Sequence, residues 1–230
     1  MDECLYLIYR YYDIGKNDTA EEIIFKSARK SYKEFWRRVI LKDKLNIDRK
    51  DIIERNVENL LCCKVPFLLE AKSQKEFDEQ HNKICLQILQ CYKNVGKVSY
   101  GIAQRWLNQT LLNLVVIESI LQTKHWNIDC VRKYFHIPVE NSFIKAATFK
   151  SKSKPTYELN LKCAPLKHNS EEKSEMSCYR LGKMQPFELW TYAEYIRFQK
   201  NVKEEIEKRG YKDTVDWTFD VALASANGNM

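Results

Sequence analysis

Glu140 is the residue of this sequence whose type and position best suit acid–base chemistry. It follows Pro138 and opens a predicted helix, so the positive end of the helix dipole stabilises its carboxylate as an anion. His136 lies four residues earlier, and a carboxylate beside an imidazole can act as a base or stabilise a developing cation. We take Glu140 and His136 as candidate catalytic residues; the alternative is that Glu140 only caps its helix.

Three polar side chains lie on the most apolar helix of the chain, and we take them as candidate substrate-binding residues. Gln104, Arg105 and Asn108 share its polar side, where they either line a pocket or form an internal network. A buried Arg105 needs an anionic partner, and Glu140 or Glu118 is the expected one.

A cationic stripe is predicted on an early helix, residues 20–41. Five basic residues follow one another at offsets of three, four, seven and eleven, opposite an apolar face, which places them on one side of the helix. Such a stripe is either a solvated face or a phosphate-binding face. The candidate nucleic-acid-binding residues of this stripe are Lys26, Arg29, Lys30, Lys33 and Arg37.

Two further segments carry candidate phosphate contacts. The turn at residues 94–99 contains Gly96 and Lys97, and its backbone amides are expected to be exposed at the start of the next helix, where they either bind a phosphate or simply connect two helices. Lys145 and Lys152 belong to a lysine-rich stretch that runs to residue 154. Together with the net charge of +7, these residues predict DNA as the partner.

The composition favours an all-α protein. Only 6 Gly and 5 Pro occur among 230 residues, which is few for a chain built of strands and tight turns. With 44% hydrophobic and 30% charged residues the chain is long enough for one core, and we expect a single globular helical domain, residues 1–230, with a long basic loop insertion.

Cysteine usage and hydropathy predict a cytoplasmic protein. The 8 cysteines lack the regular spacing of a disulfide framework, and most lie on apolar stripes. No apolar run is long enough to span a membrane, and the amino-terminal residues are acidic. Cys163, His168 and Cys178 lack a fourth ligand for zinc, so we expect no metal site. We also expect no cofactor and no membrane partner.

The candidate residues are positioned by a central helix at residues 99–121, which is apolar on most of its circumference. It belongs to a central region, 95–149, that begins with the turn at Gly96. Residues 150–183 lack periodicity and are expected to form a mobile surface loop. Further helices are expected at 1–14, 20–41, 48–64 with a kink or break at Pro66, 73–94, 128–134, 140–149, 186–209 and 213–226.

The middle of the chain resembles two groups of proteins. The pattern Tyr100-Gly101-x-Ala103-Gln104-Arg105-Trp106-x-Asn108-x-Thr110-Leu111, followed by His136-Ile137-Pro138-Val139-Glu140, is similar to one found in uncharacterised bacterial helical proteins. More distantly, the order of hairpin, buried helix, extended Pro-Val and acidic residue resembles the helix-hairpin-helix DNA glycosylases.

The second resemblance implies base excision. It places Glu140 at the acidic position of that superfamily, where the carboxylate stabilises positive charge as the base departs. When the alignment is anchored on Ala103, the position of the Schiff-base lysine falls on Gly101, so the lyase mechanism has no nucleophile. The resemblance therefore implies a glycosylase-like hydrolase without lyase activity.

A different class of function is also open. A non-enzymatic interaction protein, as one component of a bacterial assembly, would meet a protein partner through an aromatic-rich helix and the loop 150–183. Tyr, Trp and Arg concentrate binding energy at interfaces. The residues concerned are Trp190, Tyr192, Tyr195 and Arg197, at least two of which are expected to be core residues instead.

Overall fold

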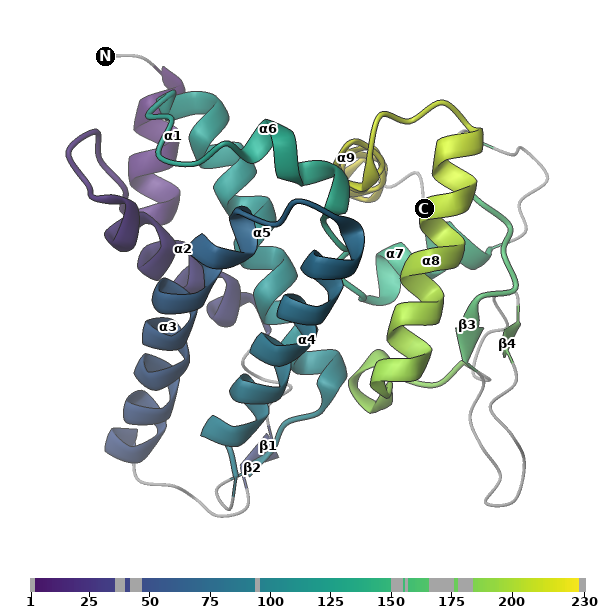
Figure 1. Ribbon diagram of the computed structural model, residues 1–230, viewed down its shortest axis with the longest axis horizontal. Helices are drawn as coiled ribbons and strands as arrows, with labels where there is room; N and C mark the ends of the chain where they lie inside the picture. Colours follow the sequence, from purple (N-terminus) through teal and green to yellow (C-terminus); the bar gives the residue numbers. More distant parts are fainter. Residues whose placement is uncertain are drawn as a thin grey trace. The chain divides into compact units, whose positions relative to one another are not determined.

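The computed structural model describes residues 3–35, 40–41, 47–93, 96–149, 155, 157–165, 176–177 and 184–227, and it confirms the all-α prediction (Figure 1). Within these residues the strands are two-residue segments that form two antiparallel pairs. The helices are α1 (Glu3–Tyr12), α2 (Ala20–Phe35), α3 (Ile47–Leu69), α4 (Gln74–Cys91), α5 (Tyr100–Leu121), α6 (Ile128–Val131), α7 (Asn141–Thr148), α8 (Tyr192–Lys208) and α9 (Thr214–Ala226), with 3₁₀ turns η2 (Arg132–Tyr134) and η3 (Phe187–Leu189).

The chain divides into two compact units. Unit 1 comprises residues 1–98 and 102–131, and unit 2 comprises residues 99–101 and 132–230. The single domain expected over residues 1–230 stays a prediction. Most of α5 belongs to unit 1, whereas its first two residues, Tyr100 and Gly101, pack within unit 2.

The core of unit 1 forms between α5 and α2. Trp106 of α5 is fully buried, and its indole Nε1 donates to the carbonyl oxygen of Ala28 at 2.8 Å. Its ring lies 4.5 Å from that of Tyr32, measured between centroids. Because a buried indole N–H needs a partner, this hydrogen bond fixes the side of α2 that faces α5.

A polar seam accompanies this apolar contact. Thr110 and Asn113 of α5 are buried, and the Asn113 amide donates to the Ser31 hydroxyl at 3.0 Å, while the Thr110 hydroxyl donates to the same oxygen at 3.3 Å. The Tyr12 hydroxyl donates to Asn113 Oδ1 at 3.2 Å. Buried polar groups that satisfy one another fix the register between helices.

Helices α3 and α4 form a neighbouring pair (Figure 1). Of the kink or break expected at Pro66, the break is wrong, because α3 continues through Pro66 to Leu69. Val65 and Leu68 have no exposed surface, so the burial of this last turn outweighs the backbone hydrogen bond that proline removes. Ser73, near which this helix was expected to begin, caps α4 by accepting from the backbone N–H of Glu76 at 3.2 Å.

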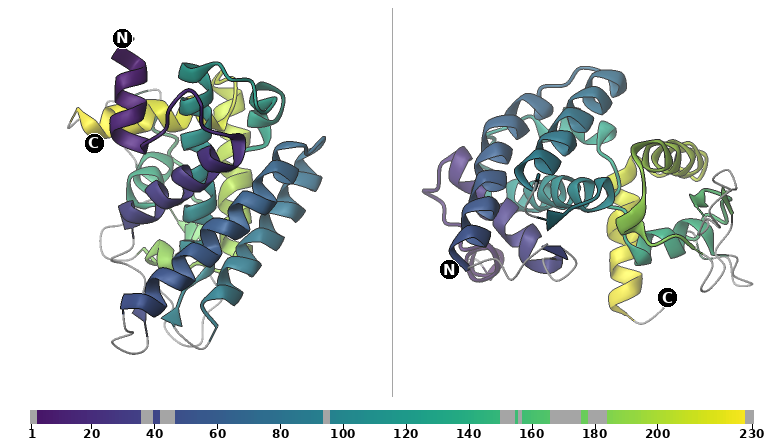
Figure 2. Two further views of the ribbon diagram at one scale, coloured as in Figure 1. Left: turned by 90° about the vertical axis from the view of Figure 1, so that its left-hand side faces the viewer. Right: turned by 90° about the horizontal axis from the view of Figure 1, so that it is seen from below.

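Unit 2 is built from α7, α8 and α9, and Figure 2 shows α9 in yellow. Asp213 caps α9 through the backbone N–H groups of Val215 and Asp216, and Arg132 donates to the Asp213 carboxylate at 2.7 and 3.2 Å. Burial lowers the pKa of Arg132, whereas the carboxylates of Asp213 and Asp216 raise it. The net shift of this pKa is upward, so the guanidinium stays charged. This ion pair anchors η2 to the start of α9.

Three predicted boundaries need correction. Helix α2 ends at Phe35 instead of near 41, because Ile40 and Leu41 form a strand, β1 (Ile40–Leu41). The helix expected over 186–209 is split into η3 and α8, because Thr191 and Glu194 form a capping box that starts a new helix. Within 150–183 a second strand pair occurs, β3 (Ala164–Pro165) with β4 (Met176–Ser177).

Candidate functional site

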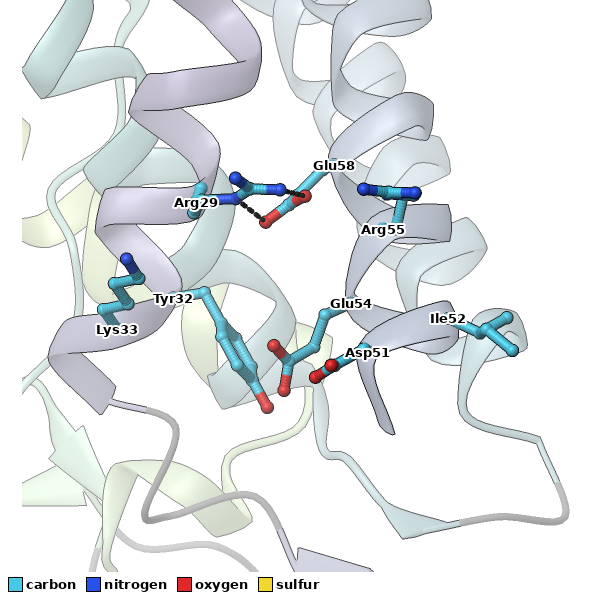
Figure 3. A pocket seen from close by; sticks show the side chains of 8 residues that line it. All are labelled: Arg29, Tyr32, Lys33, Asp51, Ile52, Glu54, Arg55 and Glu58. Atoms are coloured by element: carbon cyan, nitrogen blue, oxygen red, sulfur yellow. Dashed lines mark hydrogen bonds and ion pairs between the residues drawn. The ribbon is translucent and has the colours of Figure 1, made fainter. Parts of the chain in front are cut away.

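A pocket of about 440 Å³ opens between α2 and α3 (Figure 3). Three cationic and three acidic side chains line it, so their formal charges cancel. A site that binds phosphates concentrates positive charge, which this pocket does not do. The lining residues are Arg29, Tyr32, Lys33, Asp51, Ile52, Glu54, Arg55 and Glu58.

Arg29 and Glu58, which both line this pocket, form an ion pair. Its Nε and Nη2 atoms donate to the two carboxylate oxygens at 3.2 and 3.3 Å. The Glu58 side chain is only 5% exposed, and a buried carboxylate requires a paired cation. The expected phosphate contact of Arg29 would therefore have to compete with an internal ion pair.

Tyr32 closes one end of the pocket, where Figure 3 shows its hydroxyl beside Glu54 and Asp51. Burial, and then the neighbouring Tyr92 and Glu54, raises the pKa of Tyr32 above its ordinary value. The phenol thus keeps its proton at neutral pH and serves as a hydrogen-bond donor. Nothing in this arrangement activates it as a nucleophile.

Two further cations of the α2 stripe, Lys26 and Lys30, also have partners. The Lys26 ammonium group lies 2.9 and 3.0 Å from the Asp18 carboxylate oxygens, and the Lys30 ammonium group lies 3.3 Å from the centroid of the Tyr11 ring. Lys33 lines the pocket, and Arg37 lies outside the described residues. Lys26, Arg29 and Lys30 thus hold α2 to its neighbours within unit 1.

Gly96 and Lys97 do not form the open turn expected from the sequence. They make up strand β2 (Gly96–Lys97), which pairs antiparallel with β1, Ile40 opposite Lys97 and Leu41 opposite Gly96. A strand ladder engages backbone groups that an open turn would offer to a phosphate. Their predicted role as phosphate ligands is not supported by this geometry.

Gln104 and Asn108 form an internal network with α4, the second of the two alternatives set out for them. Both side chains are fully buried, and the Asn108 amide donates to Gln104 Oε1 at 3.0 Å. Asn108 Oδ1 then accepts from His81 Nε2 at 2.8 Å, which leaves His81 Nδ1 to accept from the Cys85 thiol at 3.7 Å. The chain of donors fixes one neutral tautomer of His81.

Arg105 is buried, with 9% of its surface exposed. Glu118 is not its partner, because 13 helical residues separate the two along about 20 Å of α5. Glu118 instead accepts from the Thr123 hydroxyl and from the backbone N–H groups of Lys124 and His125, and so caps the end of α5. Glu140, the other expected partner, belongs to unit 2.

His136 lies in the segment between η2 and α7, which α8 holds in place. Its Nδ1 atom lies 2.8 Å from the hydroxyl oxygen of Tyr195, and the imidazole is 5% exposed. Beside it, the Gln199 amide pairs with both backbone groups of Ile137, at 2.7 and 2.9 Å. The segment before Pro138 belongs to neither a helix nor a strand, and its predicted extended conformation stays a prediction.

Glu140 occupies the N-cap position of α7 with a φ of −148°. Its side chain makes no capping hydrogen bond and instead accepts from the Ser142 hydroxyl at 2.9 Å. The carboxylate is partly exposed, unlike the imidazole of His136. The two predicted catalytic residues thus have different hydrogen-bond partners: Tyr195 for His136 and Ser142 for Glu140.

Of the two lysines predicted in the 145–154 stretch, Lys145 lies among the described residues. The Lys145 ammonium group lies 5.6 Å from the centroid of the Phe149 ring, one turn farther along the chain. Lys152 lies outside the described residues.

A basic surface that the sequence analysis missed lies on unit 2, around Tyr134. The ammonium groups of Lys133 and Lys203 lie 5.1 and 6.0 Å from the centroid of its ring. The Lys203 ammonium group also donates to the carbonyl oxygen of Lys133 at 2.8 Å. Lys133 and Lys203 are 70 residues apart, so only the spacing of Lys200 and Lys203 on one helix was visible in the sequence.

The described residues hold no group of three His, Cys, Asp or Glu side chains arranged to bind a metal ion. None of the helices in the described ranges is long and apolar enough to cross a membrane. No protein-family model, no curated protein and no solved structure matches the chain.

Proposed function

We propose that the protein binds nucleic acid and contacts its phosphates through the Tyr134 surface, which consists of Lys133, Tyr134, Lys200 and Lys203. The observation that carries this proposal is the placement of two lysine ammonium groups around one aromatic ring, at 5.1 and 6.0 Å from its centroid. Two like charges beside one ring raise the local positive potential, which favours the binding of a phosphate there.

Lys200 extends this surface along α8. At 100° per residue, Lys200 and Lys203 lie 60° apart around the helix and about one turn apart along it. Lys200 and Lys133 are exposed, so their ammonium groups are accessible to a polyanion. The surface therefore presents three cations and an aromatic ring, the combination that nucleic-acid-binding surfaces use.

Nucleic-acid contact through the α2 stripe has an energetic cost. A phosphate at Arg29 or Lys26 would have to displace Glu58 or Asp18 from an existing ion pair. Displacement from Glu58 would leave a buried carboxylate without its cation, which costs about 3–5 kcal/mol. Nucleic-acid contact through α2 is therefore disfavoured.

The test compares two double variants that carry the same change in net charge. Lys133→Ala/Lys203→Ala removes the two ammonium groups beside Tyr134, and Lys75→Ala/Lys83→Ala removes two exposed lysines of α4. Binding to a labelled DNA strand is measured at low salt by fluorescence anisotropy. We expect the first variant to bind at least about tenfold more weakly and the control to bind as the wild type does. Equal affinities for both variants would contradict the proposal.

A second function, protein interaction, is favoured by α1. Only Ile8 of this helix is buried, whereas four large apolar or aromatic side chains are 48–62% exposed. Contiguous exposed apolar surface commonly marks a protein interface. The four residues are Tyr6, Leu7, Tyr9 and Tyr11.

The interface expected from the sequence is less well supported. Trp190 and Tyr195 are 2% and 0% exposed, which confirms that at least two of the four predicted interface residues are core residues. Co-purification from the native host tests the α1 alternative. A stoichiometric protein partner that is lost with Leu7→Ser/Tyr9→Ser would support it, and retention of that partner by the variant would exclude α1.

A further inference from the structure

The Tyr134 surface continues along α8 as far as its first residue. Relative to Tyr192, residues Ile196, Lys200 and Lys203 are rotated by about 40°, 80° and 20° at 100° per residue. All four therefore share one flank of the helix, over about 16 Å of its length. Glu207 is the next acidic residue on this flank, so the cationic part of the strip ends at Lys203.

Tyr192 supplies an accessible aromatic ring at the other end of this strip. Its exposed fraction is 36%, whereas Tyr195, one turn later, is fully buried. The ring meets that of Tyr100 edge to face, with centroids 5.3 Å apart and an interplanar angle of 62°. Tyr100 is itself 7% exposed, and the centroid of its ring lies 5.4 Å from that of Tyr195. The Tyr192 ring therefore packs against a buried aromatic side chain.

An apolar side chain lies beside this ring in the sequence. Leu189, at the end of η3, is 64% exposed. The Gln185 amide donates to its carbonyl oxygen at 2.9 Å, and the Trp190 indole donates to the carbonyl oxygen of Gln185 at 3.1 Å. The backbone at Leu189 is thus held in place while its side chain faces solvent.

We infer that the partner of this strip is single-stranded nucleic acid, with a base stacked on Tyr192 and the following phosphates bound by Lys200 and Lys203. This inference rests on the proposed function. In a duplex the base faces are occupied by their neighbours, whereas an unpaired base offers its whole face to an aromatic side chain. A ring at one end and ammonium groups at the other therefore match a strand whose bases are accessible.

Stacking is tolerant of sequence because every base has a π-face. Binding through Tyr192 is accordingly expected to depend on the presence of bases and little on their order. The lysines read only the backbone. The two ends of the strip thus contribute separately to binding affinity. Tyr192→Ala tests the aromatic end, and Lys133→Ala/Lys203→Ala tests the cationic end.

The experiment uses the full chain and three DNA probes of the same length: a mixed-sequence single strand, its duplex, and a strand of abasic sites. We expect the single strand to bind about tenfold more tightly than either of the other two. Tyr192→Ala should remove that advantage and leave affinity for the abasic strand unchanged, and Tyr192→Phe should retain it. Tyr9→Ala, which removes an exposed tyrosine of α1, is the matched control.

The outcomes separate the two claims. If all three probes bind equally and the Lys133→Ala/Lys203→Ala variant loses them all, the single-strand inference is overturned and the proposed function stands. If no probe binds at low salt, the proposed function fails as well. The comparison of abasic and normal strands requires no variant, so a destabilised Tyr192→Ala protein does not weaken the test.

Discussion

Gly101, in the first turn of α5, lies directly against the backbone of Phe187, and a Cβ atom at position 101 would overlap the Phe187 carbonyl oxygen. The contacting atoms belong to the backbone of η3, which a side-chain rotation cannot move. A larger residue at this position therefore requires α5 and η3 to separate within unit 2.

We predict that Gly101→Ala destabilises the protein by about 1–3 kcal/mol, the usual cost of overpacking a close contact. Urea unfolding followed by circular dichroism measures the loss. Gly15→Ala is the matched control, because a Cβ at position 15 would meet no atom within 4 Å. If the two variants unfold at the same urea concentration, the close approach of Gly101 to Phe187 does not exist in solution.

Trp106→Ala should lower the free energy of unfolding by about 3–5 kcal/mol, because the indole is fully buried and its removal leaves a large cavity. Trp106→Phe keeps an aromatic ring but loses the hydrogen bond to Ala28, so a smaller loss is expected. Denaturant unfolding of both variants gives the comparison. A loss below about 1 kcal/mol for Trp106→Ala would show that α2 and α5 do not share this core.

Cysteine reactivity should follow burial. Burial, and then Glu21 and other neighbours, raises the pKa of the Cys62 thiol from 9.0 to about 12, so it carries almost no thiolate at pH 8. Cys4, Cys63 and Cys130 are exposed and should react with a thiol reagent first. Rapid labelling of Cys62 in the native protein, identified by peptide mapping, would contradict its placement between α2 and α3.

The raised pKa of Cys62 also gives a pH dependence of stability. Below pH 9 the thiol is protonated in both the folded and the unfolded chain, and its contribution is fully present. As the pH rises toward 12 the unfolded chain loses this proton first, so stability falls with rising pH. Cys62→Ala should reduce the slope of stability against pH in that window, and an unchanged slope would assign the loss to other groups.

Glu140→Gln tests the predicted excision chemistry. The Glu140 side chain makes no capping hydrogen bond, and a glutamine oxygen can still accept from Ser142, so the fold should be retained. If the protein excises bases, single-turnover excision on a panel of modified DNA strands should be lost in this variant while DNA binding is unchanged. Unchanged excision would clear Glu140 of a catalytic role, and the absence of excision by the wild type would leave only its position at the helix start.

Much of the fold could be predicted because its determinants are local. The apolar periodicity of α4 and α5 and the helix starts near Ser73 and Asp213 are properties of neighbouring residues. The continuation of α3 through Pro66 was not predictable in this way, because it depends on the burial of Val65 and Leu68 by the rest of unit 1.

The candidate site was harder to predict because its contacts are remote in sequence. Glu58 lies 29 residues from Arg29 in the sequence and forms an ion pair with it. Arg29 had been predicted to bind phosphate. Gly96 and Lys97 are taken up by β1, more than fifty residues earlier. The Tyr134 surface joins α8 to a residue pair that carries no recognisable motif. Periodicity assigns residues to faces, but it does not show which charges are already paired.

The central claim is tested most directly by the dependence of affinity on salt. For the wild-type protein and a single DNA strand, the logarithm of the association constant should fall linearly with the logarithm of salt concentration. Each phosphate contact on a single strand contributes about 0.7 to the magnitude of that slope. Lys133→Ala/Lys203→Ala should reduce the magnitude by about 1.4, and Lys75→Ala/Lys83→Ala should leave it unchanged. A slope near zero for the wild type, or the same slope in both variants, would contradict phosphate binding at the Tyr134 surface.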